Sequence, residues 1–112
     1  MSENYVFLDD LREHAPLPEN GILSRTLQSD ERSKTIQFCF APGQELSAHT
    51  APYPAILYFA QGEADLLLGG EARQAHEGTL VHMAPKLEHG IKAKTEVVML
   101  LVMIKGTAPA AV

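Results

Sequence analysis

The sequence predicts an all-β protein in which short antiparallel strands form a sandwich or a barrel. Between Gly21 and Ile104, roughly seven to ten short segments are apolar or alternate apolar with polar residues, and turn residues separate them. No stretch of this region longer than about ten residues has the periodicity of an amphipathic helix, which argues against a parallel βαβ architecture. A chain of 112 residues fits one domain.

The alternation of residue types places the strands along the chain. Ile36, Phe38 and Phe40 fall on one face of their strand, because successive side chains point to opposite faces. The pair Gly69-Gly70 lies between two strand segments and favours a two-residue hairpin. The last expected strand is apolar on both faces, so we expect it to be covered on both sides. The expected strands cover 33–40, 54–60, 64–68, 71–75, 79–84, 89–93 and 96–104.

The two ends of the chain differ from its centre. Residues 1–20 are expected to form a short N-terminal extension, with one or two helical turns within 7–14 that end before Pro16. Residues 21–105 are expected to form the barrel. Residues 106–112 are small and are expected to form a flexible tail.

Composition and charge exclude several classes of protein. The formal net charge is −5, from 9 basic and 14 acidic residues, and the basic residues are scattered, which argues against nucleic-acid binding. The longest apolar run, Val97 to Ile104, has eight residues and is too short to span a membrane. A single cysteine, Cys39, excludes an intrachain disulfide and fits a reducing compartment. With no signal peptide visible at the N-terminus, we expect a cytoplasmic protein.

Five residues that keep a particular spacing carry a resemblance to a known family. Gly43, His49 and Gly62 are spaced like the first conserved motif of the cupins, and Gly78 and His89 resemble the second. The resemblance covers roughly residues 35–104. It implies a double-stranded β-helix, which is a jelly-roll barrel of antiparallel strands with a pocket at one mouth. It also implies a homodimer, which is common among small cupins.

The same resemblance implies a degenerate metal site. Metal-binding cupins hold one divalent ion with two His residues, a Glu and a third His that point into the barrel. This sequence keeps the first and last of these ligands, His49 and His89, and has Ala51 and Ala55 at the other two positions. Imidazole and carboxylate ligands suit Fe, Mn, Ni or Zn, so one such ion is the possible cofactor. Two imidazoles alone make a weak site, because zinc and non-haem iron sites usually have at least three protein ligands.

A possible third ligand is His82, which lies seven positions before His89. If the intervening turn is centred near Lys86, Met83 pairs with His89 and His82 faces the opposite side. A tighter turn pairs His82 with His89 instead, and the sequence leaves both registers open. A metal-free interpretation is also open, in which His49 and His89 are hydrogen-bonded polar groups at the base of a pocket. Further candidates for a metal ligand are Tyr53, Glu45 and Glu88.

The interior is expected to be apolar, because Ala55 marks the inward phase of its strand and places Leu57 and Phe59 inside with it. The residues expected to line a ligand pocket are Phe40, Tyr53, Ala55, Leu57, Phe59, Met83, Met99 and Leu101. An apolar pocket with two histidines at its mouth favours a small organic ligand with one or two polar groups.

We therefore predict a small cupin of unspecified activity that binds a small organic molecule. The alternative is a metal-dependent enzyme, dioxygenase- or isomerase-like, that uses His49, His89 and a third ligand. A third hypothesis is a metal-free catalyst with His49 or His89 as the base. The sequence does not decide whether the protein is an enzyme.

Overall fold

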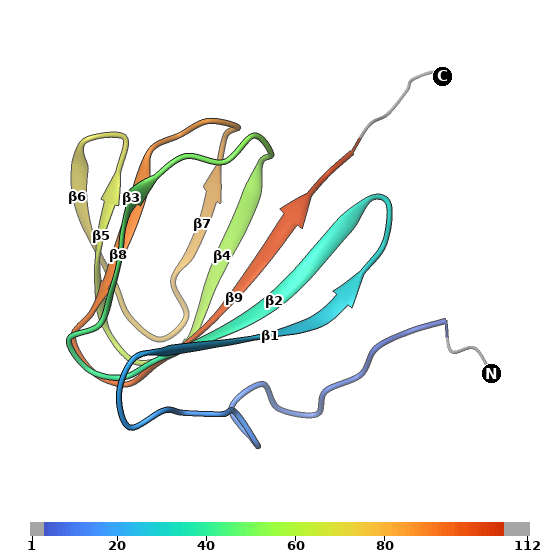
Figure 1. Cartoon of the computed structure of the whole chain (residues 1–112), viewed down its shortest axis with the longest axis horizontal. Helices are drawn as coiled ribbons and strands as arrows, with labels where there is room; N and C mark the ends of the chain where they lie inside the picture. The colour runs from blue at the N-terminus through green and yellow to red at the C-terminus, as the bar shows by residue number, and fades with distance from the viewer. Residues whose placement is uncertain (1–3, 107–112) are drawn as a thin grey trace.

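The computed structural model describes residues 4–106, in which nine strands and no helix are present (Figure 1). The end segments 1–3 and 107–112, and with them nearly all of the tail expected at 106–112, lie outside the described residues. Residues 4–106 therefore include no helix of the length and apolar character needed to cross a membrane. The strands are β1 (Ile22–Ser29), β2 (Ser33–Phe40), β3 (Glu45–His49), β4 (Ala55–Gln61), β5 (Ala64–Leu68), β6 (Glu71–Ala75), β7 (Leu80–Met83), β8 (His89–Ala93) and β9 (Val97–Ile104).

The strands form two antiparallel sheets that face each other as a jelly roll, so the all-β prediction is confirmed. The five-stranded sheet has the order β1-β2-β9-β4-β7, and the four-stranded sheet has the order β3-β8-β5-β6. Strands that follow one another in the chain often lie in different sheets, as β2 and β3 or β7 and β8 do (Figure 1). Segments far apart in the sequence are thereby placed side by side.

The core lies between the inner faces of the two sheets. Phe59 of β4 pairs with Met99 of β9, and Met99 pairs with Phe38 of β2, which places these three in one row across the larger sheet. Leu66 of β5 and Ile91 of β8 are buried in the same cluster from the other sheet. Each fully buried side chain of this size contributes about 1.5–3 kcal/mol to folding. The apolar alternation seen in the sequence therefore supplies the contacts that hold the sheets together.

The outer face of the larger sheet is covered in part by the N-terminal segment (Figure 1). The side chain of Gln37 on β2 is 1% exposed, and its Nε2 donates a hydrogen bond of 2.6 Å to the carbonyl oxygen of Leu11. At the start of β9, Val97, Val98 and Met99 are all buried, which confirms that this part of the strand is covered on both sides.

The one or two helical turns expected within 7–14 do not form a helix. The backbone makes a turn instead, in which the amide of Glu13 donates to the carbonyl of Asp10. Asp10 also accepts hydrogen bonds from the backbone and the side chain of Arg12. These local bonds, together with the bond from Gln37 to the Leu11 carbonyl, satisfy backbone groups that a helix would otherwise use.

Gly62, in the turn between β4 and β5, provides a test of the fold. Its φ is +93°, and an added Cβ would overlap the carbonyl oxygen of Glu96. We expect Gly62→Ala to lower the free energy of unfolding by about 2–3 kcal/mol, because backbone strain and a steric clash add. Urea denaturation followed by circular dichroism measures this change.

The matched control is Gly70→Ala. Gly70 has a similar φ of +88°, but nothing lies within 4 Å of an added Cβ, so only the backbone strain remains. Equal losses of stability for the two variants would contradict the close approach of Gly62 to Glu96.

Candidate functional site

The structure brings together the two histidines that the sequence places 40 positions apart. His49 at the end of β3 is the register partner of His89 at the start of β8, and their ring centroids lie 4.4 Å apart with an interplanar angle of 55°. The register of this pair shifts between Leu46 and His49. Gly90 permits the close approach of the two strands, because an added Cβ there would lie 3.2 Å from the amide nitrogen of Ala48. The pair is therefore fixed by the pairing of β3 with β8.

Hydrogen bonds to the backbone orient both imidazole rings. Nδ1 of His49 lies 2.8 Å from the carbonyl oxygen of Ser47, and Nδ1 of His89 lies 2.9 Å from that of Leu87. A carbonyl oxygen only accepts, so Nδ1 of each ring carries the proton that is donated. In the neutral ring, Nε2 then has a free lone pair, and within residues 4–106 neither Nε2 atom has a hydrogen-bond partner. Each Nε2 is available to a ligand.

A cavity of about 200 Å³ lies beside the histidine pair, between the two sheets. Its wall is mostly apolar, and both histidines contribute to it. Ala51 and Ala55 also line it, and these are the two positions at which the sequence lacks the expected metal ligands. Small side chains at both positions enlarge the space in front of the imidazoles. The lining residues are Ile36, Phe38, His49, Ala51, Tyr53, Ala55, Met83, Ala84, Leu87, His89, Leu101 and Met103.

Four of the residues expected in the pocket lie in this wall, namely Tyr53, Ala55, Met83 and Leu101. The other four, Phe40, Leu57, Phe59 and Met99, do not line the cavity but pack in the core, where none is more than 1% exposed. They share the inward-facing phase of their strands, but lie further from the mouth. Sequence reasoning missed Ile36 and Leu87 as lining residues. The alternation in β2 pointed to Ile36, whereas no sequence pattern pointed to Leu87.

Both registers considered for His82 are wrong. β7 and β8 belong to different sheets, so neither His82 nor Met83 pairs with His89. Within the larger sheet Met83 pairs with Ala55 and is buried, whereas His82 pairs with Ile56 and is exposed on the other face. His82 therefore does not approach the two histidines of the cavity.

The turn after β7 carries the chain to the other sheet rather than back along the same one. Lys86 in this turn has a φ of +68°, and its amide donates a hydrogen bond of 2.7 Å to the carbonyl of Ala51. This bond attaches the turn to the loop that follows β3. The cavity mouth is thus formed by two loops that are hydrogen-bonded to each other.

The residues around the cavity do not fit the divalent metal site expected from the resemblance. Residues 4–106 contain no group of three or more His, Cys, Asp or Glu side chains that could hold a metal ion. Glu45 and Glu88 do not line the cavity. Two imidazoles alone fall short of the three or four protein ligands that zinc and non-haem iron sites usually have. No chemical step through such an ion is therefore derived.

Cys39 lies outside the cavity. It pairs with Leu23 and Val98 on the face of β2 opposite to Phe38, and it is fully buried. Burial raises the pKa of the Cys39 thiol. A buried thiol of this kind is a poor nucleophile, because the reactive form is the thiolate.

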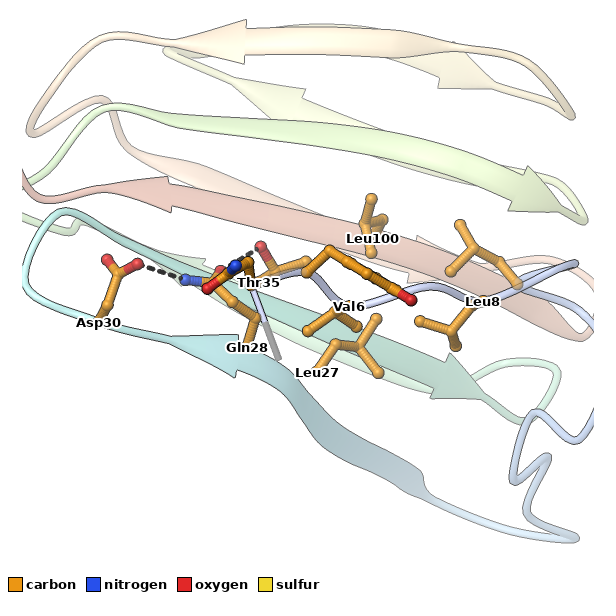
Figure 2. Close-up of a pocket in the computed structure, with 10 residues that line it drawn as sticks. Val6, Leu8, Leu27, Gln28, Asp30, Thr35 and Leu100 are labelled. Atoms are coloured by element: carbon orange, nitrogen blue, oxygen red, sulfur yellow. Dashed lines mark hydrogen bonds between the residues drawn. The ribbon is translucent and has the colours of Figure 1, made fainter. Parts of the chain in front are cut away.

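A second, more open cavity of about 580 Å³ lies on the outer face of the larger sheet (Figure 2). Val6 and Leu8 of the N-terminal segment face Leu27 and Leu100 across it. At one end, Gln28 accepts a hydrogen bond of 2.9 Å from Thr35 and donates one of 3.1 Å to Asp30. Its polar side chains are thus bonded to one another, and no histidine lines it, so the smaller cavity is the better candidate for a functional site.

Comparisons with known proteins agree with this fold. The Cupin domain family matches residues 36–105. A conserved protein of unknown function from Streptococcus pyogenes has a similar structure, with 27% sequence identity, a TM-score of 0.81, and coverage of 96% of this chain and 93% of that one. No curated protein sequence matches the chain.

Two further solved structures are similar at lower identity and show the fold alone. A cupin superfamily protein from Desulfitobacterium hafniense has 22% identity, a TM-score of 0.75, and coverage of 80% of this chain and 82% of that one. An RmlC-like cupin from Shewanella frigidimarina has 17% identity, a TM-score of 0.74 and coverage of 78% of both chains.

The register of the histidine pair can be tested by cross-linking. Directly opposed residues of antiparallel strands have Cα atoms about 4.5–5.5 Å apart, which is within the range of a disulfide. We expect His49→Cys with His89→Cys, in a Cys39→Ala background, to form a disulfide under mild oxidation. The closed loop is predicted to raise the free energy of unfolding by about 3–4 kcal/mol, measured by urea denaturation with and without reductant.

The matched control is His82→Cys with His89→Cys in the same background. These positions lie in different sheets, and His82 faces away from His89, so no intrachain disulfide is expected. A disulfide in the control, or none in the first variant, would show that the assigned register is wrong.

Proposed function

The chain belongs to the cupin family, and we propose that it binds a small organic molecule in the cavity beside His49 and His89. The observation that carries this proposal is the pair of oriented imidazoles at the edge of an apolar cavity, each with Nε2 free. Ligand sites are typically apolar with a few placed polar groups that fix orientation, and this cavity has that composition.

The volume of the cavity limits the size of the ligand. A dry apolar cavity of about 150 Å³ is large enough to bind benzene. The space of about 200 Å³ here therefore suits one ring, or a short branched chain, with one substituent. Isoleucine, leucine, phenylalanine and methionine side chains from both sheets and from the loop before β8 provide its apolar surface.

The histidine pair limits the polar group of the ligand. A neutral ring that donates through Nδ1 accepts through Nε2, so it favours a hydroxyl or a protonated carboxyl group. A protonated ring donates through both nitrogens and favours a carboxylate. We therefore propose a ligand with a single hydroxyl or carboxyl group on an otherwise apolar body. Binding is preferred here to metal-dependent catalysis, because a third ligand of the usual kind is not among the described residues.

Benzyl alcohol, benzoate and toluene together test the proposal. We expect benzyl alcohol and benzoate to shift the amide signals of residues around His49 and His89 in two-dimensional NMR titrations. His49→Ala should weaken benzyl alcohol binding by about 5–10-fold, because one hydrogen bond contributes about 1 kcal/mol. Binding of toluene, which has no polar group, should change little in that variant. Ala55→Leu should abolish binding of all three by filling the cavity.

His82→Ala is the matched control, because His82 is an exposed histidine on the other face of β7. It should bind all three probes like the unmodified protein. The proposal fails if no probe shifts these signals, or if Ala55→Leu binds as before.

We also propose that two copies associate through the outer face of the larger sheet. Tyr5, Phe7 and Leu80 are 74%, 75% and 63% exposed, and contiguous exposed apolar surface is a mark of interaction sites. Light scattering should give twice the 12.2 kDa mass of one chain at micromolar concentration. Phe7→Glu with Leu80→Glu should reduce this to a monomer. A monomeric unmodified protein would overturn the proposal.

A further inference from the structure

We infer that the same cavity is a binding site for a soft monovalent metal ion, Cu(I), held by Nε2 of His49 and His89 and by the thioether sulfurs of Met83 and Met103. This inference goes beyond the proposed binding of an organic molecule and does not depend on it. It rests on the kind of donor atoms that line the cavity and on the way in which the strands bring them together.

The two methionines are neighbours of the same small residue. Met83 of β7 and Met103 of β9 are both register partners of Ala55 in β4, one on each side of it. All three line the cavity together with the two histidines. Ala55 occupies little of the space between the methionine side chains, so the thioethers have room to turn towards a bound ion. A thioether chain has three rotatable bonds and adapts readily to such a position.

The two pairs of donors face each other from opposite sheets. The histidines belong to β3 and β8 of the smaller sheet, and the methionines belong to β7 and β9 of the larger one. Packed sheets lie about 10 Å apart, a separation that an imidazole from one side and a thioether from the other can bridge. Because all four residues line one cavity of about 200 Å³, a single ion between the sheets lies within reach of both kinds of donor.

The donor set is soft and uncharged. No carboxylate and no thiolate lines the cavity, so the available donors are imidazole nitrogens, thioether sulfurs and the hydroxyl of Tyr53. Thioethers select Cu(I), whereas Mg, Ca and Mn prefer carboxylate, carbonyl and water. Neutral donors leave the full charge of an ion uncompensated, and in a mostly apolar cavity this costs less for a monovalent ion than for a divalent one.

The imidazoles are already oriented for metal binding. Metal-ligating histidines typically donate their second ring nitrogen to a carbonyl or a carboxylate, which fixes the tautomer and the ring position. Both His49 and His89 make this bond, to the Ser47 and Leu87 carbonyls at 2.8 and 2.9 Å. The bonds leave both Nε2 lone pairs available, so the nitrogen half of the site is formed before any ion arrives.

The test is an anaerobic titration of the full chain with Cu(I) against a chromogenic Cu(I) chelator. We expect one Cu(I) per chain. Met83→Leu with Met103→Leu should weaken Cu(I) binding by at least roughly tenfold, and His49→Ala should do the same. Leu replaces Met at similar volume and usually costs less than about 1.5 kcal/mol of stability, so these variants should fold. Copper X-ray absorption should show sulfur neighbours in the unmodified protein and none in the double Leu variant.

Matched controls separate this site from other places where Cu(I) could bind. Met99→Leu changes a methionine on β9 that lies in the core and not at the cavity, and it should leave affinity unchanged. Cys39→Ala removes the lone thiol and should also leave affinity unchanged. His82→Ala tests the exposed histidine on β7 in the same way.

Three results would overturn the inference. The first is binding of less than one Cu(I) per chain. The second is an affinity that the double Leu variant does not change, which would reduce the site to its two imidazoles. The third is loss of Cu(I) binding in Cys39→Ala, which would place the ion on the thiol. None of these results bears on the titrations with benzyl alcohol, so the two proposals stand or fall separately.

Discussion

The pairing of β3 with β8 is the constraint on which the candidate site depends. It closes a loop of 40 positions between the two histidines, and the entropy cost of such a closure grows with loop length. Few of the contacts that offset this cost are in β3 itself, which has no buried residue. They come from β8, which is almost fully buried between β3 and β5. The position of His49 is therefore determined by the packing of its partner strand, and Gly90 permits the approach because it has no side chain.

Much of the fold could be predicted from the sequence, because alternation and turn residues are local signals. The expected segments for β2, β4, β5, β6 and β9 agree closely with the observed strands. The course of the chain after β7 could not be predicted in this way. Pro85 and Lys86 indicate a turn, but a turn within one sheet and a crossing between two sheets have the same local signal. The bond between the Lys86 amide and the Ala51 carbonyl, which fixes the crossing, joins residues far apart in the chain.

The cavity shows a similar limit. A period of two assigns a side chain to the inner or the outer face, but it gives no information about height between the two ends of a barrel. Leu57 and Ala55 share a face, yet Leu57 is in the packed core and Ala55 is at the cavity. The histidine pair was easier to anticipate, because the spacing of the flanking glycines fixes which strand ends carry the two rings. The role of Met103 required the register of β4 with β9, which no single segment reveals.

The loss of two hard metal ligands changes what the cavity requires in order to be stable. A buried carboxylate without a partner costs several kcal/mol, and a metal-binding cavity therefore depends on its ion. Here Ala51 and Ala55 bring no charge, and each imidazole has one nitrogen bonded to the backbone. Within the described residues, no buried side-chain polar atom lacks a hydrogen-bond partner. The cavity is thus satisfied without a ligand, which is a property that a reversible binding site needs.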